Sequence, residues 1–297
     1  MEKDQIVILE ERGLISVLGL DARDFIQNIV SNDIDKVDTN NSIFSAIFTP
    51  EGKYLYEFFI IKSNEGYFLE CDQNLVEEMI NYLLKFKLRS KVEIENLSDK
   101  FVVGIINEEK FKEIQTTTST NVNNETFLYN EKTPCLLDPR TNLLGARILS
   151  SFEELHLIIK KLSLKIIDKD HYLKNSYMLG IPNEGTDKLK DQLFGLEANF
   201  EELNAIDFKK GCYVGQENTA RMKLKNKIRR RLLSINSEKE LSIGSQIFFE
   251  DKPVGKVLIN KPYSFALIKL FDPDIDSFSD EKLSCENLTI KIIKLPI

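Results

Sequence analysis

The chain has 297 residues, of which 42% are hydrophobic and 29% are charged, proportions typical of a folded soluble protein with room for two or three domains. Its formal net charge of −7 argues against a general nucleic-acid-binding protein, so we expect no direct contact with nucleic acid outside a local basic patch. No apolar run approaches the ~20 residues that cross a bilayer, and we expect no contact with a membrane.

The cysteines indicate a compartment and limit the metal chemistry. The four cysteines are scattered without a CxxC pair: Cys71, Cys135, Cys212 and Cys285. This pattern fits a reducing compartment, and it lacks the ligand spacing of a zinc site or of a stably held cluster. The polar N-terminus also lacks the apolar stretch of a signal peptide. We therefore predict a cytoplasmic protein without a stably bound metal.

Hydrophobic patterning predicts a series of strands and a first helix within residues 6–106. Two short strands are expected within 6–18, around a turn at Arg12 and Gly13. Asp21 is a candidate N-cap for the helix that follows. Further strand-like runs lie at 43–48, 54–62, 66–71, 92–95 and 101–106. Strands arranged around helices favour an α+β fold with a split βαβ unit.

Further helices are predicted, the first of them between two of these strands, and only strands are predicted near the C-terminus. Amphipathic helical spacing is found at 73–88, 152–162 and 170–179. The polar stretch 116–126 is predicted to be a linker. Strand-like runs near the C-terminus lie at 231–235, 246–249, 254–259, 264–270 and 289–294. This last set predicts a small β-barrel or β-sandwich domain.

The segment KKGCYVGQE at 209–217 is the strongest candidate for chemistry. Gly211 and Gly215 flank Cys212 at a spacing that permits a tight turn, with backbone amides open to a ligand. Lys210 and its neighbour add positive charge beside the thiol, which favours the reactive thiolate. The segment therefore predicts a reactive cysteine.

Two other side chains of the segment could assist the thiol. Tyr213 and Glu217 are close enough in sequence to orient a ligand or to exchange a proton with it. The alternative is that Cys212 is a small buried hydrophobe and that the glycines only shape a turn. The other three cysteines lack such neighbours, and we assign them to structural positions.

Basic residues occupy every odd position from 221 to 231, a run that we call the basic stripe. A period of two predicts a strand with one basic face. An anionic ligand such as a polyglutamate tail, a phosphate backbone or an acidic partner protein could lie on that face. A solvated strand face is the alternative. The absence of aromatic residues in the stripe argues against binding of single-stranded RNA.

The segment 194–233, which contains KGCYVGQE, resembles the signature of the YgfZ-type folate-binding proteins and their mitochondrial iron–sulfur assembly counterparts, within the glycine-cleavage T-protein (aminomethyltransferase-like) superfamily. Supporting pieces are GLDARDFIQNIVSNDI at 19–34, TPEGKYLYEFFI at 49–60 and LGIPNEG at 179–185. They follow the family's order along the chain, whereas residues from about 100 to 165 contribute little to the resemblance.

The resemblance implies a T-protein-like fold. Interlocked α/β domains with split βαβ, ferredoxin-like elements would surround a central opening and would be followed by a C-terminal β-barrel. The implied domains are a folate-binding region at 1–227 and a barrel at 228–297. The first would contain two subdomains, about 1–40 with 127–227, and 41–126.

The resemblance also implies the site residues. The catalytic candidates are Cys212, Lys210, Tyr213 and Glu217. The residues that would shape the motif are Gly211, Gly215, Gln216 and Arg221. Tyr172 falls where a relative places a folate-contacting tryptophan, and its ring could stack on a pterin; ordinary helix packing is the alternative. Glu197 matches a pterin-binding position, where a carboxylate can accept hydrogen bonds from the pterin.

Some positions depart from the family pattern. T proteins carry paired aspartates in the hairpin aligned with Tyr56 and Glu57, and the first aspartate has no carboxylate counterpart here. This argues against glycine-cleavage aminomethyl transfer. Arg12 stands where a relative has an aromatic folate contact, and Ser176 stands where some members carry arginine. The pose of the folate is therefore left open.

The function implied by the resemblance is that of a tetrahydrofolate-binding factor for the assembly or maintenance of 4Fe–4S proteins, including radical enzymes that modify tRNA. Cys212 would be a redox-active or transiently ligating thiol, because one cysteine cannot hold a cluster alone. Its partners would be iron–sulfur assembly or client proteins. One alternative is a folate-dependent aminomethyl or one-carbon transferase, and another is a non-catalytic RNA or protein interaction module. Whether the chain is an enzyme stays open.

Overall fold

The computed structural model describes residues 1–118, 124–225 and 228–293, and the chain divides into two compact units. The first unit contains Met1–Ile47, Tyr56–Tyr172 and Leu203–Val214. The second contains Phe48–Leu55, Leu173–Glu202 and Gly215–Ile297. Each unit combines segments that are far apart in the sequence, and the first takes residues from both expected subdomains. The division into 1–227 and 228–297, and the central opening, stay predictions.

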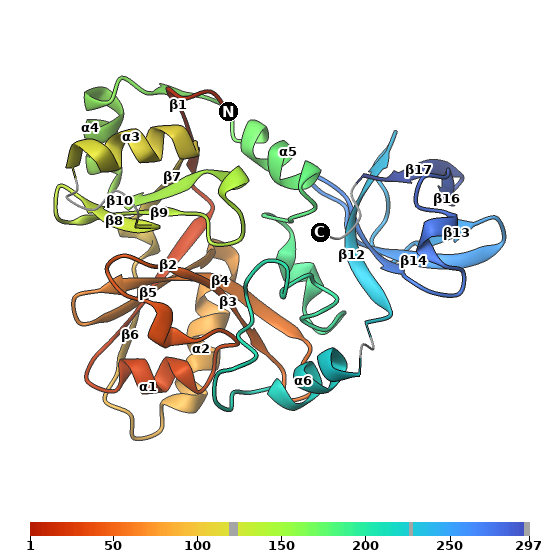
Figure 1. Cartoon of the computed structure of the whole chain (residues 1–297), viewed down its shortest axis with the longest axis horizontal. Coiled ribbons are helices and arrows are strands. Elements are labelled where there is room, and N and C mark those ends of the chain that lie inside the picture. Colours follow the sequence, from red (N-terminus) through yellow and green to blue (C-terminus); the bar gives the residue numbers. More distant parts are fainter. Residues whose placement is uncertain (119–123, 226–227, 294–297) are drawn as a thin grey trace. The chain divides into compact units, whose positions relative to one another are not determined.

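A mixed six-stranded sheet in the first unit has the strand order β11-β1-β7-β10-β9-β8 (Figure 1). Its strands are β1 (Gln5–Leu9), β7 (Val102–Ile106), β8 (Thr126–Tyr129), β9 (Thr133–Leu137), β10 (Ala146–Ser150) and β11 (Lys165–Ile166). The helices α3 (Glu108–Thr118) and α4 (Phe152–Lys161) pack on it. Phe111 of α3 and Leu155 of α4 share one buried apolar cluster with Ile6 of β1, so the sheet and its helices form one core.

A five-stranded sheet has the order β3-β4-β5-β2-β6. Its strands are β2 (Arg12–Leu18), β3 (Ile43–Phe48), β4 (Tyr54–Ser63), β5 (Gly66–Asp72) and β6 (Glu93–Asn96). Helix α2 (Val76–Lys87) buries Val76, Met79 and Leu83. Gly13 of β2 permits this packing, because a Cβ atom there would lie 2.3 Å from Val76 Cγ2.

The two N-terminal strands were placed correctly, but the turn between them was not. The chain turns at 10–11 rather than at 12–13, and β1 and β2 belong to different sheets. The reason is that β2 pairs with β5 along its whole length, from Arg12 opposite Asp72 to Leu18 opposite Gly66. Pairing with a distant strand satisfies more backbone groups than a short local hairpin would.

Most other predicted elements are confirmed, including α2, α4 and α5 (Asp170–Met178). Asp21 precedes α1 (Ala22–Gln27), but its carboxylate accepts a hydrogen bond from the backbone N–H of Lys91 at 2.7 Å and makes no cap bond. Part of the predicted linker at 116–126 is helical, because α3 extends to Thr118. The strands β8 to β10 and helix α3 were not predicted. Strands β9 and β10 are buried throughout, so they lack the alternating pattern that marks a half-exposed strand.

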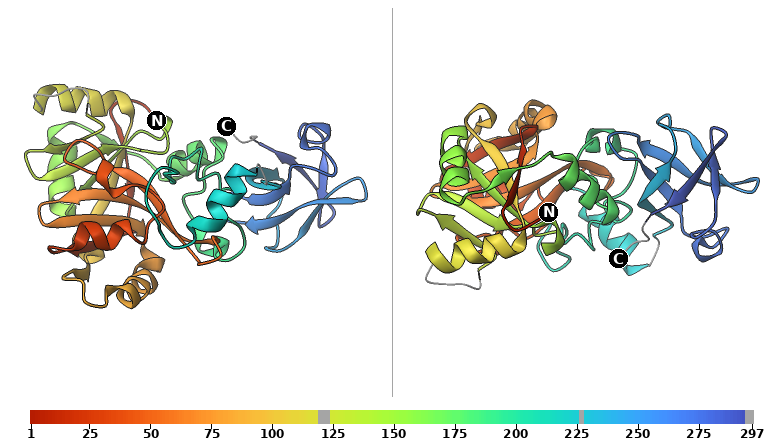
Figure 2. Two further views of the ribbon diagram at one scale, coloured as in Figure 1. Left: turned by 60° about the horizontal axis from the view of Figure 1, so that its bottom comes forward. Right: turned by 90° about the horizontal axis from the view of Figure 1, so that it is seen from above.

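The C-terminal strands, drawn in blue in Figure 2, close into a barrel. Their order around the barrel is β12-β15-β14-β13-β16-β17. They are β12 (Arg230–Ser237), β13 (Gln246–Phe249), β14 (Lys252–Ile259), β15 (Phe265–Lys269), β16 (Leu283–Cys285) and β17 (Leu288–Ile292). Buried apolar side chains such as Leu233, Val257 and Phe278 fill its interior. The predicted α+β class with a C-terminal β-barrel is confirmed. None of the helices in the described part of the chain is both long and apolar enough to cross a membrane.

The basic stripe is not a strand, which corrects the interpretation of 221–231. Residues Gln216–Leu224 form helix α6, β12 begins only at Arg230, and 226–227 lie outside the described residues. On a helix, residues two apart point in directions about 200° apart, so the odd positions do not share a face. Lys223 pairs with Glu201, and Arg231 is buried against Glu202. The described residues of the stripe therefore do not form a single basic face.

Candidate functional site

The residues predicted for the site are divided between the two units. Lys210, Gly211, Cys212, Tyr213 and Tyr172 belong to the first unit. Gly215, Gln216, Glu217, Arg221 and Glu197 belong to the second. The KGCYVGQE motif therefore contributes side chains to two different structural environments.

Lys210 anchors the motif loop to the segment that follows helix α1. The side chain is buried, and its Nζ donates hydrogen bonds to the backbone carbonyls of Gln27 (2.7 Å), Val30 (2.6 Å) and Asn32 (3.0 Å). Three acceptors match the three N–H donors of an ammonium group. Gln27 is the last residue of helix α1, where carbonyls lack helical partners, and Val30 and Asn32 lie in the segment that follows.

The electrostatics of Lys210 follow from this position. Burial lowers the pKa of Lys210 to about 8, although the carboxylates of Asp33 and Asp207 oppose the shift. Asp207 also shapes the loop: its Oδ1 accepts hydrogen bonds from the backbone N–H of Lys209 (2.6 Å) and of Lys210 (3.1 Å). The ring centroid of Tyr213 lies 5.0 Å from Lys210 Nζ, a cation–π contact. The buried side chains of Lys210 and Tyr213 therefore stabilise the loop that carries Cys212.

Cys212 is exposed, whereas Cys71, Cys135 and Cys285 are buried. Burial raises the pKa of the Cys71 and Cys135 thiols to about 12, which keeps them protonated and unreactive. A Cβ atom added at Gly211 would meet no atom within 4 Å, so the space beside Cys212 is open. The interpretation of Cys212 as a buried hydrophobe is thus contradicted, and the structural assignment of the other three is confirmed.

The second half of the motif starts helix α6. Gly215 has a left-handed backbone with φ 83°, and a Cβ atom there would lie 2.4 Å from the carbonyl oxygen of Thr49. Only glycine fits this position without displacing its neighbour. Glu217 is exposed in the first turn of α6, where the helix dipole favours negative charge. Arg221 is exposed on the same helix.

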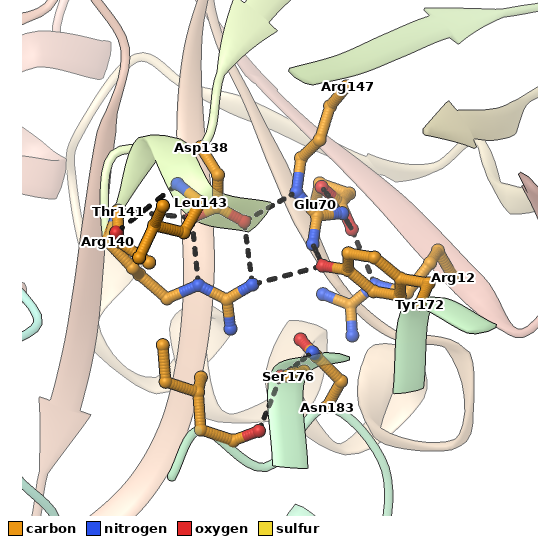
Figure 3. A network of polar contacts seen from close by, with 11 residues as sticks. Arg12, Glu70, Asp138, Arg140, Thr141, Leu143, Arg147, Tyr172, Ser176 and Asn183 are labelled. Carbon is orange, nitrogen blue, oxygen red and sulfur yellow. Dashed lines mark hydrogen bonds and ion pairs between the residues drawn. The ribbon is translucent and has the colours of Figure 1, made fainter. Parts of the chain in front are cut away.

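Tyr172 is a member of a buried polar network (Figure 3). Its hydroxyl oxygen accepts hydrogen bonds from Arg147 (3.0 Å) and Arg140 (3.3 Å). Arg147 also binds both carboxylate oxygens of Glu70, each at 3.0 Å. Since Glu70 lies in β5 and Arg147 in β10, the network ties the five-stranded sheet to the six-stranded sheet. Its role as a folate contact stays a prediction; its hydroxyl is engaged in the network.

The network contains three guanidinium groups, from Arg12, Arg140 and Arg147, and two carboxylates, from Glu70 and Asp138. Burial alone would raise the pKa of Asp138. Arg140, which binds this carboxylate through two nitrogens, outweighs burial together with the charge of Arg147, so the pKa of Asp138 lies below its usual value. Arg12 joins at the edge and donates from Nε to Glu70 Oε1 at 2.5 Å. Removal of one partner would leave a buried charge uncompensated, which is more costly than loss of an exposed pair.

Glu197 lies in the wall of a pocket in the second unit. The pocket has a volume of about 930 Å³ and is lined by Phe194, Glu197, Asn218, Met222, Arg229, Arg230, Lys269, Phe271 and Asp272. The Glu197 carboxylate binds Arg230 through Nε (2.8 Å) and Nη2 (3.1 Å) and accepts a hydrogen bond from the backbone N–H of Phe194 (3.0 Å). A carboxylate has about four acceptor sites, so Glu197 retains capacity for a donor on a ligand. The pocket has the size of a small-molecule site.

The positions that depart from the family pattern have local explanations. Tyr56 donates a hydrogen bond to Glu78 Oε1 at 2.9 Å, and burial raises the pKa of its phenol. Ser176 donates to the carbonyl of Ile181 at 2.5 Å and accepts a hydrogen bond from Asn183. Both side chains serve local packing.

Sequence reasoning missed the buried network and most of the pocket. Charged residues inside apolar strands were the available signal: Glu70 interrupts YFLECD and Arg147 interrupts GARILS. A charge at a buried strand position requires a partner. Nothing in the local pattern identifies that partner. Among the other pocket residues, Arg229 belongs to the basic stripe, whereas Lys269 and Phe271 carried no comparable signal.

Comparisons of sequence find iron–sulfur assembly factors. The chain is 26% identical over 310 aligned positions to the "Iron-sulfur cluster assembly factor IBA57 homolog, mitochondrial" of Dictyostelium discoideum, covering 93% of this chain and 74% of that protein. It is 29% identical over 232 positions to the protein of the same name from Pyricularia oryzae, covering 76% of this chain and 55% of that protein. The chain thus spans little more than half of the second relative. No family model matches the chain.

The comparison of structures identifies the fold. The glycine cleavage system aminomethyltransferase T from Bartonella henselae superposes with a TM-score of 0.75, covering 98% of this chain and 85% of that protein. The two sequences are 12% identical, so the similarity shows the fold and nothing about the reaction. The T-protein-like fold expected from the sequence is confirmed.

The predicted cytoplasmic location is contradicted by the comparisons, because both relatives are named as mitochondrial proteins. The prediction came from unpaired cysteines. Such cysteines indicate that a compartment does not promote disulfides. They do not single out the cytosol among compartments of that kind.

Proposed function

We propose that this chain is a YgfZ-type, tetrahydrofolate-binding factor for the assembly or maintenance of 4Fe–4S proteins, with radical tRNA-modifying enzymes among its clients. The names of the relatives support the iron–sulfur part, and the alignment with the first covers 93% of the chain. The observation that carries the proposal is the exposure of Cys212 on a loop that the buried Lys210 anchors.

Cys212 provides one thiolate to a cluster in transit. A 4Fe–4S cluster takes about four ligands. In the described ranges, no group of three or more His, Cys, Asp or Glu side chains is arranged to hold a metal ion. The remaining ligands therefore belong to a partner protein. Because the loop is anchored, it loses little conformational entropy when the thiol binds a cluster shared with that partner.

The pocket of the second unit is the proposed folate site. Glu197 accepts a hydrogen bond from the pterin with its remaining capacity, and Phe194 and Met222 line the same pocket with apolar surface. When bound, a reduced folate supplies a carrier for one-carbon units. Tyr172 belongs to the first unit, where its hydroxyl is engaged in the buried network, and its contact with a folate stays a prediction.

The iron–sulfur proposal is tested with Cys212→Ser, which replaces only the sulfur. The variant is expressed in cells that lack their own factor of this kind, and the activity of a 4Fe–4S enzyme is measured. We expect activity no higher than in cells without the chain. Lys252→Gln, at an exposed position on the barrel outside the motif, is the control and should restore activity fully. Full activity of Cys212→Ser would overturn the proposal.

The folate proposal is tested separately by calorimetric titration of the purified full chain with tetrahydrofolate. We expect saturable binding of one ligand per chain. Absence of binding at millimolar ligand would remove the folate part and leave the iron–sulfur part standing, since the two experiments have independent readouts.

A further inference from the structure

The turn that follows helix α2 has a leucine where glycine is expected. The backbone N–H of Ser90 donates a hydrogen bond to the carbonyl of Lys87 at 2.8 Å, which closes a turn with Leu88 and Arg89 at its centre. Leu88 has φ 41° and ψ −108°. This is the geometry of the first central position of a type II′ turn, which glycine normally occupies. A leucine strains the backbone there, and such strain is found mainly at functional positions.

Packing does not explain why a leucine stands in this turn, because Leu88 is 89% exposed. A second leucine, Leu20, is 88% exposed. It precedes Asp21, whose carboxylate accepts a hydrogen bond from the backbone N–H of Lys91 at 2.7 Å. Among the large apolar residues that the structure describes, these two leucines are the most exposed. They belong to separate segments that this contact brings together, at the lower edge of the first unit in Figure 1, near α1 and α2.

The exposed leucines lie among cations. Residues 84–91, which we call the basic tip, contain four basic side chains and no carboxylate, although acidic residues outnumber basic ones by 47 to 40 in the whole chain. None of these four side chains has an ion pair or a hydrogen bond with a residue of the described ranges. The next carboxylate along the chain is that of Glu93 in β6. The four cations are Lys85, Lys87, Arg89 and Lys91.

This composition fits an anionic lipid surface. Lysine and arginine side chains are attracted by the negative surface potential of such a membrane, and leucine side chains gain by entering the boundary between headgroups and acyl chains. A nucleic acid would attract the same cations, but leucine has no ring to stack on a base. Peripheral contact needs no long apolar run, so it is compatible with the sequence features from which we expected no membrane contact.

We propose that the basic tip binds the surface of an anionic membrane. Leu88 enters the headgroup boundary, with Leu20 beside it, and the four cations face lipid phosphates. The attachment is reversible, because two leucines and a few cations bind far more weakly than a spanning helix. The inference is independent of the proposed function, since the basic tip shares no residue with the KGCYVGQE motif or with the pocket of the second unit.

The test measures sedimentation of the purified full chain with vesicles at about 0.1 M salt, where the cations are only partly screened. Vesicles of phosphatidylcholine containing about one third phosphatidylglycerol are compared with vesicles of phosphatidylcholine alone. We expect binding to the anionic vesicles to be at least about tenfold stronger, and to weaken at about 0.5 M salt because screening increases.

Two variants separate the contributions of charge and of apolar contact. The double variant Lys87→Gln, Arg89→Gln should bind the anionic vesicles about tenfold more weakly. Leu88→Gly should also bind them about tenfold more weakly. Its thermal unfolding midpoint should not fall, because glycine accepts the backbone geometry of the turn. A weaker interaction of this variant therefore reports the lost side chain and not a lost fold.

The controls remove the same groups elsewhere. Lys252→Gln, Lys282→Gln removes two exposed charges from the barrel, and Leu157→Ala removes a leucine that is 63% exposed on α4. Both should bind like the original chain. Equal binding to the two kinds of vesicle, or an equal loss in the controls, would overturn the inference. A loss in the charge variant that Leu88→Gly does not share would assign the cations to an acidic protein or a nucleic acid, and would overturn it as well.

Discussion

The ammonium nitrogen of Lys210 lies 2.6 Å from the carbonyl oxygen of Val30, although 180 residues separate the two in the chain. This contact fastens the loop of the exposed Cys212 to the N-terminal segment. Lys210 therefore fixes the position of this loop through hydrogen bonds to backbone carbonyls, in addition to any effect of its charge on the Cys212 thiol.

Replacement of Lys210 by methionine should destabilise the protein. Lys210→Met keeps the length of the side chain but leaves three buried carbonyls without their donor, and we expect a loss of about 3 kcal/mol in the free energy of unfolding. Lys209→Met, at the exposed neighbour, should change it by less than about 0.5 kcal/mol. Urea denaturation measures both variants. Equal stability of the two would show that the carbonyl contacts contribute nothing.

The same lysine should give a characteristic pH dependence. Burial lowers its pKa to about 8 from an ordinary value of 10.5, so between these pH values the unfolded chain binds the proton more strongly than the folded chain. The contribution of Lys210 to the free energy of unfolding therefore rises as pH increases from about 8 to 10.5. The difference between the original chain and Lys210→Met, measured by urea denaturation across this range, should increase. A flat or falling difference would contradict the assigned pKa.

The two glycines of the motif should respond differently to alanine. Gly215 has φ 83° and its Cβ would lie 2.4 Å from a carbonyl oxygen, so Gly215→Ala should cost more than about 2 kcal/mol. Gly211 has open space around it, and Gly211→Ala should cost less than about 0.5 kcal/mol. Thermal or urea denaturation distinguishes them. Similar losses would mean that the environment of one glycine is wrongly assigned.

Glu197 and Glu202 provide a matched pair for the folate site. Each carboxylate binds one arginine through two nitrogens, Arg230 and Arg231 respectively, but only Glu197 lines the pocket. Glu197→Gln should weaken tetrahydrofolate binding at least about tenfold, because a charged acceptor is lost. Glu202→Gln should leave the affinity unchanged. An equal effect of both variants, measured by calorimetry, would indicate a general loss of stability and not a ligand contact.

The hydroxyl of Tyr172 should contribute to stability through the buried network. Tyr172→Phe removes the oxygen that accepts from Arg147 and Arg140, and we expect a loss of about 2 kcal/mol. Tyr82→Phe is the control, because its hydroxyl makes no hydrogen bond with residues in the described ranges. Since the ring is kept, tetrahydrofolate affinity should be unchanged. Weaker binding by Tyr172→Phe, with stability intact, would assign the hydroxyl to the ligand.

The sequence predicted the elements whose pattern is local. The barrel strands other than β16, and the helices α2, α4 and α5, were predicted near their actual bounds, because apolar spacing reports which face of a regular element is buried. The pattern failed where local spacing has two explanations. Basic residues at every second position resemble a strand face, but helix α6 occupies Gln216–Leu224, and Gly215 packed against Thr49 starts it.

The amino-acid sequence by itself determined the residue types of the KGCYVGQE motif. It also predicted the periods of strands and helices and the C-terminal barrel, since each of these depends on neighbours a few positions apart. Three facts were not: the exposure of Cys212, the carbonyls around Lys210, and the meeting of Glu70 with Arg147, 77 residues further along the chain. They were decided by packing between distant segments, because burial and the choice of a hydrogen-bond partner are properties of the folded chain as a whole.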